Sequence, residues 1–230
     1  DECIIKNPAR KLNMPKTTEG SYRSITEHER EHILKVAEWH RGGLWVLTML
    51  YTGCRPKETR YLNWADVDFK NGRLFIDGTK SDAAKRRVPL PPELLDRFRQ
   101  EFKKAKTTFI FHQKKDETKP HTETSMRRMW ENFKRELDIS MGAKVYNNKI
   151  ILSVVAHDLV PYCMRHTYAT DCQTAGVPIN IAKVLMGHSD IKTTGDIYTD
   201  YTQEHEKQVT KTLNAFWGCA KGVPKQEENA

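Results

Sequence analysis

The sequence predicts an α+β fold that is mainly α-helical, with one small antiparallel three-stranded sheet. Along most of the chain, apolar residues recur at helical spacing between capping residues and prolines. Residues 64–90 differ, because they alternate in polarity around Asn71-Gly72, a dipeptide typical of tight hairpin turns. The 230 residues suffice for one large domain with its own core.

Helices should come first. Thr26 and Glu29 form a capping box, so a helix should begin there. Its apolar face should comprise Ile33, Leu34, Val36, Ala37 and Trp39. A second, mostly apolar helix should cover about residues 44–52. Pro56 stands where a first-turn proline belongs, which predicts a short helix continuing through residues 57–62.

The sheet should follow. Strands are expected at residues 64–69 and 73–76 on either side of the turn, and a third at 87–90 after a loop over 77–85. Five further helices are then expected, from Pro92 to about 104, over 122–137, and at about 161–175, 178–186 and 190–198. Two shorter features should lie between them: a short buried strand or turn at 109–111 and a hairpin-like insert at about 141–156 around Asn147-Asn148.

The predicted organisation is a polar linker over residues 1–24, one domain over 25–217 and a flexible tail over 218–230. The linker would follow a missing N-terminal DNA-binding region. The domain should end in a tail helix at about 202–217, whose apolar stripe is Val209, Leu213 and Phe216.

The composition favours a basic intracellular protein. A net charge of +8 and a pI near 9.2 favour an anionic partner such as nucleic acid, although a basic enzyme without such a partner would look the same. The five cysteines are scattered without a C-x-x-C pair, which argues against disulfides or a structural zinc and fits a reducing cytoplasm. No apolar run is long enough to span a membrane.

Two arginines suggest a site for a phosphate. Arg55 should begin a short helix after Gly53, where backbone N–H groups also favour an anion, and Glu58 lies within reach to orient it. An ordinary surface Arg–Glu pair would have the same spacing. Arg165 lies on a largely apolar helix and therefore needs a partner, either a phosphate or a structural carboxylate.

A histidine and a tyrosine complete the set. His188, expected in a loop, can donate a hydrogen bond to an anion, although such residues often only end a helix. Tyr198 would usually be a packing residue. Together with the arginines, these groups are sufficient to break a phosphodiester without metal, because the arginines neutralise the phosphate that the tyrosine attacks.

These residues lie in stretches that together resemble the catalytic domain of the tyrosine recombinases, the phage integrase family. The stretches are Thr52–Glu58, Gly78–Lys80 before Arg87–Leu90, Arg165–Thr170, Leu185–Ser189 and Thr193–Thr199. The Tyr162–His166 stretch and the hairpin-like insert before it look most similar to integrases of conjugative transposons.

The resemblance implies a role for each residue. Tyr198 would attack the scissile phosphate and form a 3′-phosphotyrosine. Arg55 and Arg165 would hold the non-bridging oxygens, Lys80 would protonate the leaving 5′ oxygen, and His188 would hydrogen-bond the phosphate. Neither metal nor another cofactor would be needed.

Two assignments stay open at this point. Tyr162 stands where the family usually has a histidine that acts as general base, and a phenol is a poor base near neutral pH. Lys85 is the alternative to Lys80, because the register of the loop is uncertain.

The resemblance further implies a site-specific recombinase, or integrase, that integrates or excises a mobile element. Its partners would be double-stranded DNA and further copies of itself, as a homo-tetramer on two DNA sites that exchanges tail helices, in the bacterial cytoplasm and without a membrane. A type IB topoisomerase and a non-catalytic DNA-binding remnant are alternatives. A zinc peptidase is a further alternative, because His28–His32 matches the zinc-binding pattern H-E-x-x-H. It is the more distant one, because the match lies in the charged first turns of a capped helix.

Overall fold

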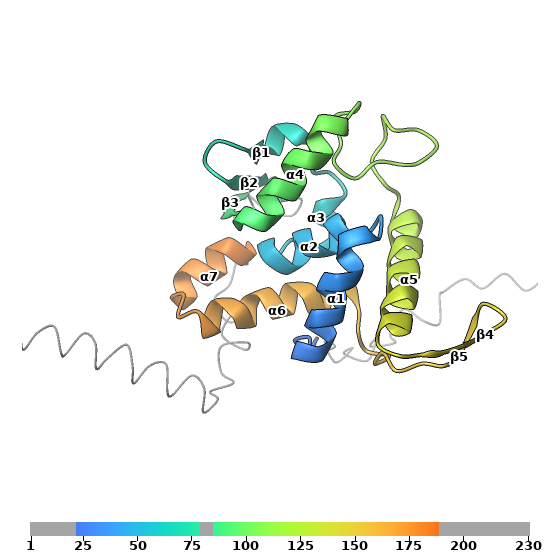
Figure 1. Cartoon of the computed structure of the whole chain (residues 1–230). Helices are drawn as coiled ribbons and strands as arrows, with labels where there is room; N and C mark the ends of the chain where they lie inside the picture. Colours follow the sequence, from blue (N-terminus) through green and yellow to red (C-terminus); the bar gives the residue numbers. More distant parts are fainter. Residues whose placement is uncertain (1–21, 79–84, 189–230) are drawn as a thin grey trace, which may run out of the picture.

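The computed structural model describes residues 22–78 and 85–188 (Figure 1). Helix α2 (Gly43–Thr52) lies at the centre of this part of the chain. Helices α1 (Glu27–Trp39), α4 (Pro92–Lys104) and α6 (Pro161–Thr174) pack around α2, and the small sheet lies beside α4. The mainly helical fold with a small antiparallel sheet is thereby confirmed.

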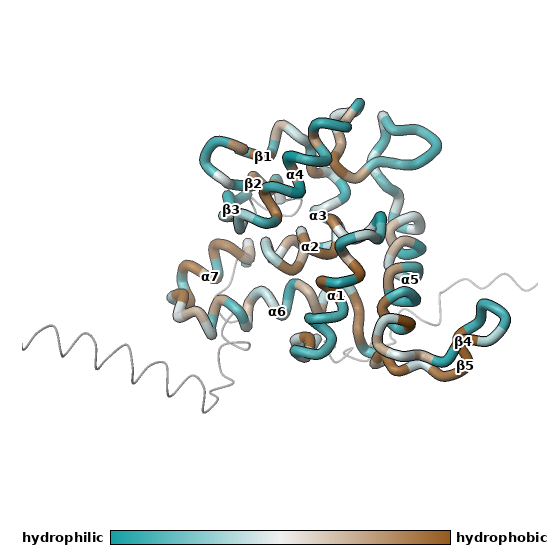
Figure 2. The backbone as a smooth tube through the Cα atoms, in the orientation of Figure 1, coloured by the Kyte–Doolittle hydropathy of each residue, from teal (hydrophilic) through white to brown (hydrophobic). Residues whose placement is uncertain are grey.

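Helix α2 is central because it is apolar on all sides, as its colour along the tube in Figure 2 indicates. Trp45, Val46 and Leu47, which are successive positions and so point about 100° apart around its axis, are all buried. The hydroxyl of Thr48 is satisfied inside the helix, because it donates to the carbonyl of Leu44 at 2.7 Å.

The capping box of α1 is present as predicted. Thr26 Oγ1 accepts from the backbone N–H of Glu29 at 3.1 Å, and a Glu29 carboxylate oxygen accepts from that of Thr26 at 2.8 Å. Trp39 was wrongly placed on the buried face, since it is 62% exposed. Two positions beyond the buried Ala37, it points about 200° around the helix and away from the core.

The three-stranded sheet is antiparallel in the order β1 (Val67–Asp68), β2 (Arg73–Ile76) and β3 (Arg86–Pro89). The first strand is shorter than predicted, because Trp64–Asp66 forms a 3-10 turn. Asp66 accepts from the backbone N–H of Asn63 at 2.8 Å and so holds the chain in that turn.

Two further boundaries differ from the prediction, and one alternative that the sequence left open is decided. Strand β3 begins at Arg86, one residue early, and the short helix α3 (Pro56–Thr59) ends before residue 62. At 109–111, where a short buried strand or turn was expected, the chain forms no strand: Phe109 makes only an isolated bridge with Asn63, and residues 110 and 111 are buried in a bend.

The hairpin predicted around Asn147-Asn148 is present. Helix α5 (Glu123–Ser140) leads into β4 (Lys144–Tyr146) and β5 (Lys149–Leu152), which pair in antiparallel fashion and project from the body of the molecule. Asn147 and Asn148 have φ values of 46° and 60°, and a two-residue turn of type I′ requires positive values at both positions.

The segment before α1 contacts α6. The Ser24 hydroxyl lies 2.7 Å from that of Thr170, and the Ile25 N–H donates to the Thr167 hydroxyl at 2.9 Å. Five predicted features lie wholly or mostly outside the described residues: the linker over 1–24, the 77–85 loop, the helices at 190–198 and 202–217, and the tail over 218–230. Within the part that the structure describes, no helix is long and apolar enough to cross a membrane.

Candidate active site

Three arginines from distant elements converge on the C-terminal end of α7 (Ile179–Met186). Three successive backbone carbonyls each accept a hydrogen bond from a different arginine: Leu185 from Arg86 Nε at 2.8 Å, Met186 from Arg165 Nη2 at 2.6 Å, and Gly187 from Arg55 Nη2 at 3.2 Å. The last carbonyls of a helix lack partners within the helix and carry the negative end of its dipole. The end of α7 therefore gathers the three cations.

Two glycines allow this convergence. Gly187 ends α7 with a φ of 62°, and a Cβ there would lie 2.7 Å from Arg86 Nη1. Gly53 ends α2 with a φ of 63°, and a Cβ there would lie 2.5 Å from the ring of Tyr168. Both positions need the left-handed conformation and the absence of a side chain. The carbonyl of Gly53 also accepts a hydrogen bond from Arg165.

Arg55 immediately precedes α3, and Glu58 lies in the first turn of that helix, as predicted. One Glu58 oxygen accepts from Arg55 Nη1 at 2.7 Å, and the other accepts from the backbone N–H of Arg55 at 2.9 Å. Burial alone would raise the pKa of Glu58, but hydrogen bonds from Arg86 and Arg55 outweigh burial and lower it to about 2. Glu58 is therefore ionised and holds the Arg55 guanidinium in place.

Arg86 is the member of this cluster that sequence reasoning missed. Its side chain is 0% exposed and grips Glu58 with two nitrogens, Nη2 at 2.8 Å and Nη1 at 3.4 Å. The available signal was the two-residue period of a strand, which places Arg86 on the same buried face as Val88 and Leu90. An arginine at a core-facing strand position requires a buried partner.

Arg165 forms the floor of the site. The residue is 4% exposed, and its described partners are the Gly53 and Met186 carbonyls and His188, rather than the carboxylate considered from the sequence. Burial, together with the charges of Arg55 and Arg86, lowers its pKa to about 9, so it remains charged at neutral pH.

His188 is held as a neutral imidazole. Its Nε2 lies 2.7 Å from Arg165 Nη2, and because a guanidinium only donates, Nε2 must accept and the ring proton resides on Nδ1. Burial and then the charges of Arg165, Arg55 and Arg86 lower the pKa of His188 to about 3. An uncharged histidine beside charged arginines can offer an anion only a hydrogen bond through Nδ1.

The structure brings together four of the seven predicted site residues: Arg55, Glu58, Arg165 and His188. Tyr162 lies three residues before Arg165 on α6, but its described ring contact is a stack on Tyr22, with centroids 4.9 Å apart. Lys80 and Tyr198 lie outside the described residues. Lys85, the alternative to Lys80, is exposed.

The H-E-x-x-H stretch is used for structure. Both carboxylate oxygens of Glu29 accept from Arg23 at 2.7 Å, and His32 pairs with the hydroxyl of Ser140 at 2.8 Å. Among the described residues, no group of three or more His, Cys, Asp or Glu side chains is arranged to hold a metal ion.

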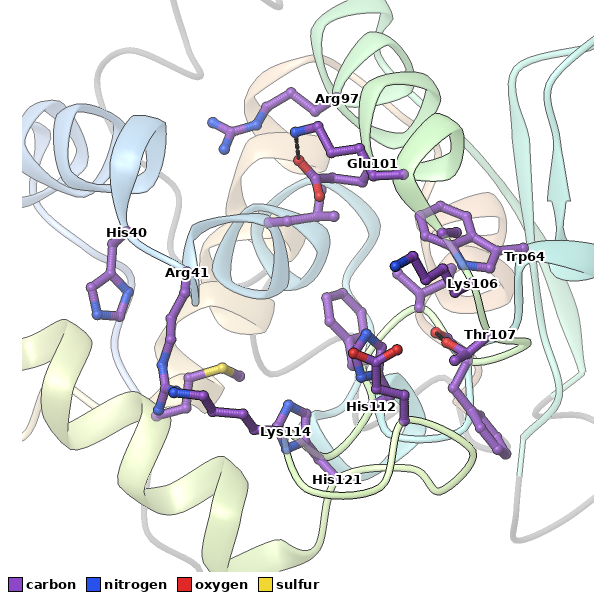
Figure 3. Close-up of a pocket in the computed structure, with 18 of the residues that line it drawn as sticks. His40, Arg41, Trp64, Arg97, Glu101, Lys106, Thr107, His112, Lys114 and His121 are labelled. Atoms are coloured by element: carbon purple, nitrogen blue, oxygen red, sulfur yellow. Dashed lines mark hydrogen bonds and ion pairs between the residues drawn. The ribbon is translucent and has the colours of Figure 1, made fainter.

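A second basic region lies elsewhere (Figure 3). This basic hollow has a volume of about 640 Å³ and lies between the end of α1, α4 and the segment before α5. Its rim includes Arg41, Arg97, Lys106, Lys114 and Glu117. Leu44, at the first turn of α2, lines it, whereas Arg165 binds Gly53 at the other end. Ten residues of helix, about 15 Å, thus separate it from the arginine cluster.

Comparison with known proteins identifies the family of this chain. The model of the phage integrase family matches residues 23–205, most of the chain, including every residue of the arginine cluster. This chain belongs to the phage integrase family. It is a tyrosine recombinase catalytic domain, as the family resemblance of its motifs implied.

Curated relatives agree. Tyrosine recombinase XerA of Pyrococcus horikoshii is 30% identical over 207 residues, which are 89% of this chain and 66% of that protein. The transposase from transposon Tn916 of Enterococcus faecalis is 23% identical over 93% of this chain and 57% of its own length. The chain thus spans about two thirds of the length of the XerA relatives in the family.

Solved structures of the family share the fold. The Tn1549 transposon integrase in complex with transposon right end DNA matches with a TM-score of 0.67 at 20% identity, over 86% of this chain and 68% of that one. The crystal structure of XerA recombinase matches with a TM-score of 0.62 at 21% identity, over 87% of this chain and 66% of that one.

Proposed function

We propose that this chain is the catalytic part of a site-specific DNA recombinase that cuts and rejoins strands through a 3′-phosphotyrosine. The observation that carries the proposal is the convergence of Arg55 and Arg165 beside the neutral His188. A phosphodiester resists attack because of its negative charge, so charged arginines fixed around one point supply what the reaction needs.

In the cleavage step, the Tyr198 phenol gives its proton to solvent water, and its oxygen forms a bond to phosphorus while the bond from phosphorus to the 5′ oxygen breaks. Lys80 gives a proton to that leaving oxygen. Rejoining reverses the step, because the phosphotyrosine conserves the bond energy for attack by a 5′-hydroxyl. The chain's own side chains perform each of these steps, and no cofactor takes part in the proposed route.

Arg55 and Arg165 differ in solvent exposure, and they therefore differ in how each stabilises the phosphate. The Arg55 side chain is 28% exposed and stands at the mouth of the site, where it meets a non-bridging phosphate oxygen first. Arg165 adds its charge from the floor. His188 donates through Nδ1, since Nε2 already accepts from Arg165.

Tyr162 takes a hydrogen-bonding role in this proposal. A phenol donates to a phosphate oxygen but removes protons poorly near neutral pH. The arginines beside the phosphate lower the pKa of an approaching Tyr198 phenol, which makes a strong base unnecessary. If this is right, Tyr162→Phe leaves the shape of the pH–rate profile of cleavage unchanged and lowers only its height.

The partners follow from the reaction. The substrate is double-stranded DNA at the attachment sites of a mobile element, which the enzyme integrates or excises in the bacterial cytoplasm. Four copies act on two DNA sites and exchange the tail helices expected at about 202–217. The Tn1549 integrase, whose catalytic fold this chain shares, is described on transposon end DNA, which supports this proposal.

A suicide DNA substrate tests the proposal. Cleavage at a nicked site should trap a covalent protein–DNA adduct, which mass spectrometry should locate on Tyr198. Tyr198→Phe should abolish the adduct while DNA binding persists. Binding without an adduct in the wild type would indicate a DNA-binding remnant, and an adduct without strand exchange between two duplexes would indicate a topoisomerase.

A further inference from the structure

One side chain in the centre of the site takes no direct part in the proposed cleavage. Arg86 is completely enclosed, so a DNA phosphate cannot reach its guanidinium. A buried charge is costly unless it is compensated, and an apolar side chain would fill this position on β3 at less cost. The contacts of Arg86 indicate what it contributes.

Arg86 and Arg55 share the same carboxylate. Arg86 Nη2 donates to Glu58 Oε2 at 2.8 Å and Nη1 to Oε1 at 3.4 Å. Arg55 Nη1 donates to Oε1 at 2.7 Å, and its backbone N–H to Oε2 at 2.9 Å. Glu58 is thus fixed from two sides, and the guanidinium of Arg55 takes its position from a carboxylate that Arg86 holds.

A third hydrogen bond from Arg86 goes to the end of α7, which also holds the guanidinium of Arg55. Arg86 Nε donates to the carbonyl of Leu185 at 2.8 Å, two residues before the carbonyl of Gly187 that receives Arg55 Nη2. The Arg86 side chain also packs closely against Gly187, since a Cβ there would lie 2.7 to 3.2 Å from its Nη1, Cζ and Cδ atoms. The backbone that leads into His188 therefore rests on Arg86.

We infer that Arg86 is a positioning residue, which sets the guanidinium of Arg55 and the approach of His188 by bridging Glu58 to the end of α7. The inference rests on the proposed recombinase function. Arg86 acts through the groups that hold the phosphate, and not through protonation of the leaving oxygen by Lys80. Lysine cannot replace it fully, because a single ammonium nitrogen cannot span both carboxylate oxygens and a carbonyl.

The test compares Arg86→Lys and Arg86→Gln with Arg87→Gln, a matched control at the neighbouring, exposed position of β3. Adduct formation is measured in single turnover at saturating DNA. One substrate is ordinary, and the other carries a 5′-bridging phosphorothioate, whose thiolate leaves without a proton. Arg86→Lys should bind DNA normally but cleave both substrates at least about 10-fold more slowly. Arg86→Gln should be slower still, and Arg87→Gln should match the wild type.

Two outcomes would overturn the inference. A folded Arg86→Lys that cleaves at the wild-type rate would reduce Arg86 to a packing role. A defect that disappears on the phosphorothioate would place its effect on the leaving group. If the single Arg86 variants do not fold, the inference is tested by comparing the cleavage rate of the double variant Glu58→Gln with Arg86→Gln to that of Glu58→Gln. The loss of rate in the double variant should not exceed that of Glu58→Gln alone, because both residues act on Arg55 together, and additive losses would contradict this.

Failure of the proposed recombinase function can be distinguished from failure of the inference about Arg86. If the wild type forms no adduct, that proposal is wrong, and the inference is judged by the ring ¹⁵N signals of His188 in the free protein. Those signals should move in Arg86→Gln and stay in place in Arg87→Gln. Unmoved signals in Arg86→Gln would refute a positioning role for Arg86.

Discussion

The arginine cluster and the basic hollow are both positively charged, yet they are built in opposite ways. In the cluster, two of the three guanidiniums, those of Arg55 and Arg86, share one buried carboxylate, and all three donate to successive carbonyls at a helix end, so that their charge is directed at one point. In the hollow, the Arg41 and Lys114 side chains extend from an exposed rim that also carries Glu101 and Glu117.

The difference teaches that a hollow lined by basic side chains does not by itself indicate a catalytic site in this molecule. The hollow has a volume of about 640 Å³, but its charges are of mixed sign, and its Lys104 pairs with Glu101 at 3.0 Å on the surface, where ion pairs contribute little. The cluster costs free energy to bury, and such arrangements gather at functional sites. Each prediction below contrasts a residue of the cluster with a counterpart elsewhere.

The largest expected effect is on stability, at the buried carboxylate. Glu58→Gln leaves Arg55 and Arg86 without their counter-charge and should lower the free energy of unfolding by about 3 to 5 kcal/mol. Glu117→Gln, at the rim of the hollow, should change it by less than about 0.5 kcal/mol. Urea unfolding followed by circular dichroism measures both, and equal effects would erase the contrast between the two regions.

The next effect is on cleavage. Arg165→Ala should slow adduct formation by about 10²- to 10³-fold, because a fixed charge beside the phosphate is lost. Arg97→Ala removes an arginine from the hollow and should leave the rate unchanged. Rates are compared on protein shown to be folded, with Arg165→Lys as the variant that keeps the charge. A comparable loss in Arg97→Ala would assign the hollow a part in the reaction.

A moderate effect is expected at the end of α7. Gly187→Ala should cost about 1 to 2 kcal/mol from its left-handed backbone alone, and more from the contact with Arg86. Gly142→Ala is a matched control, because its φ is also positive, at 101°, yet no atom lies within 4 Å of the Cβ position. Thermal unfolding should show the larger loss at Gly187, and the reverse order would contradict the close packing of Arg86.

A smaller effect concerns pH. His188 has its pKa lowered from 6.5 to about 3, so its contribution to stability is complete above pH 6.5 and is lost as the pH falls toward 3. Glu58, lowered from 4.5 to about 2, adds a loss below pH 4.5. His188→Gln should flatten the fall in the urea midpoint between pH 6.5 and 4.5 more than His121→Gln does. His121 lines the hollow, and burial lowers its pKa too.

The smallest effect should come from the rim of the hollow. Arg41→Ala and Lys114→Ala remove exposed charges and should alter the free energy of unfolding by less than about 0.5 kcal/mol. Adduct formation should remain at the wild-type rate in both. A tenfold loss of cleavage in either variant would show that the proposed site extends across the molecule.

Much of the fold was predictable because its signals are local. The Thr26–Glu29 capping box, the Asn147-Asn148 turn and the apolar α2 each depend on residues within a few positions of one another. Errors arose where a nearby contact overrode the pattern. The hydrogen bond between Asp66 and Asn63 holds residues 64–66 in a 3-10 turn, where the first strand was predicted to begin. The start of the third strand, at Arg86, was missed by one residue.

The sequence alone determined the family, the mixed fold and the identity of Arg55, Glu58, Arg165 and His188 as one set, because these follow from short motifs and their order. Only the tertiary structure revealed that the arginines meet at three successive carbonyls of α7 and that Arg86 joins them. The physical reason is that a carbonyl is present at every residue and carries no sequence signal. Which carbonyls a buried guanidinium binds is decided when distant helices pack.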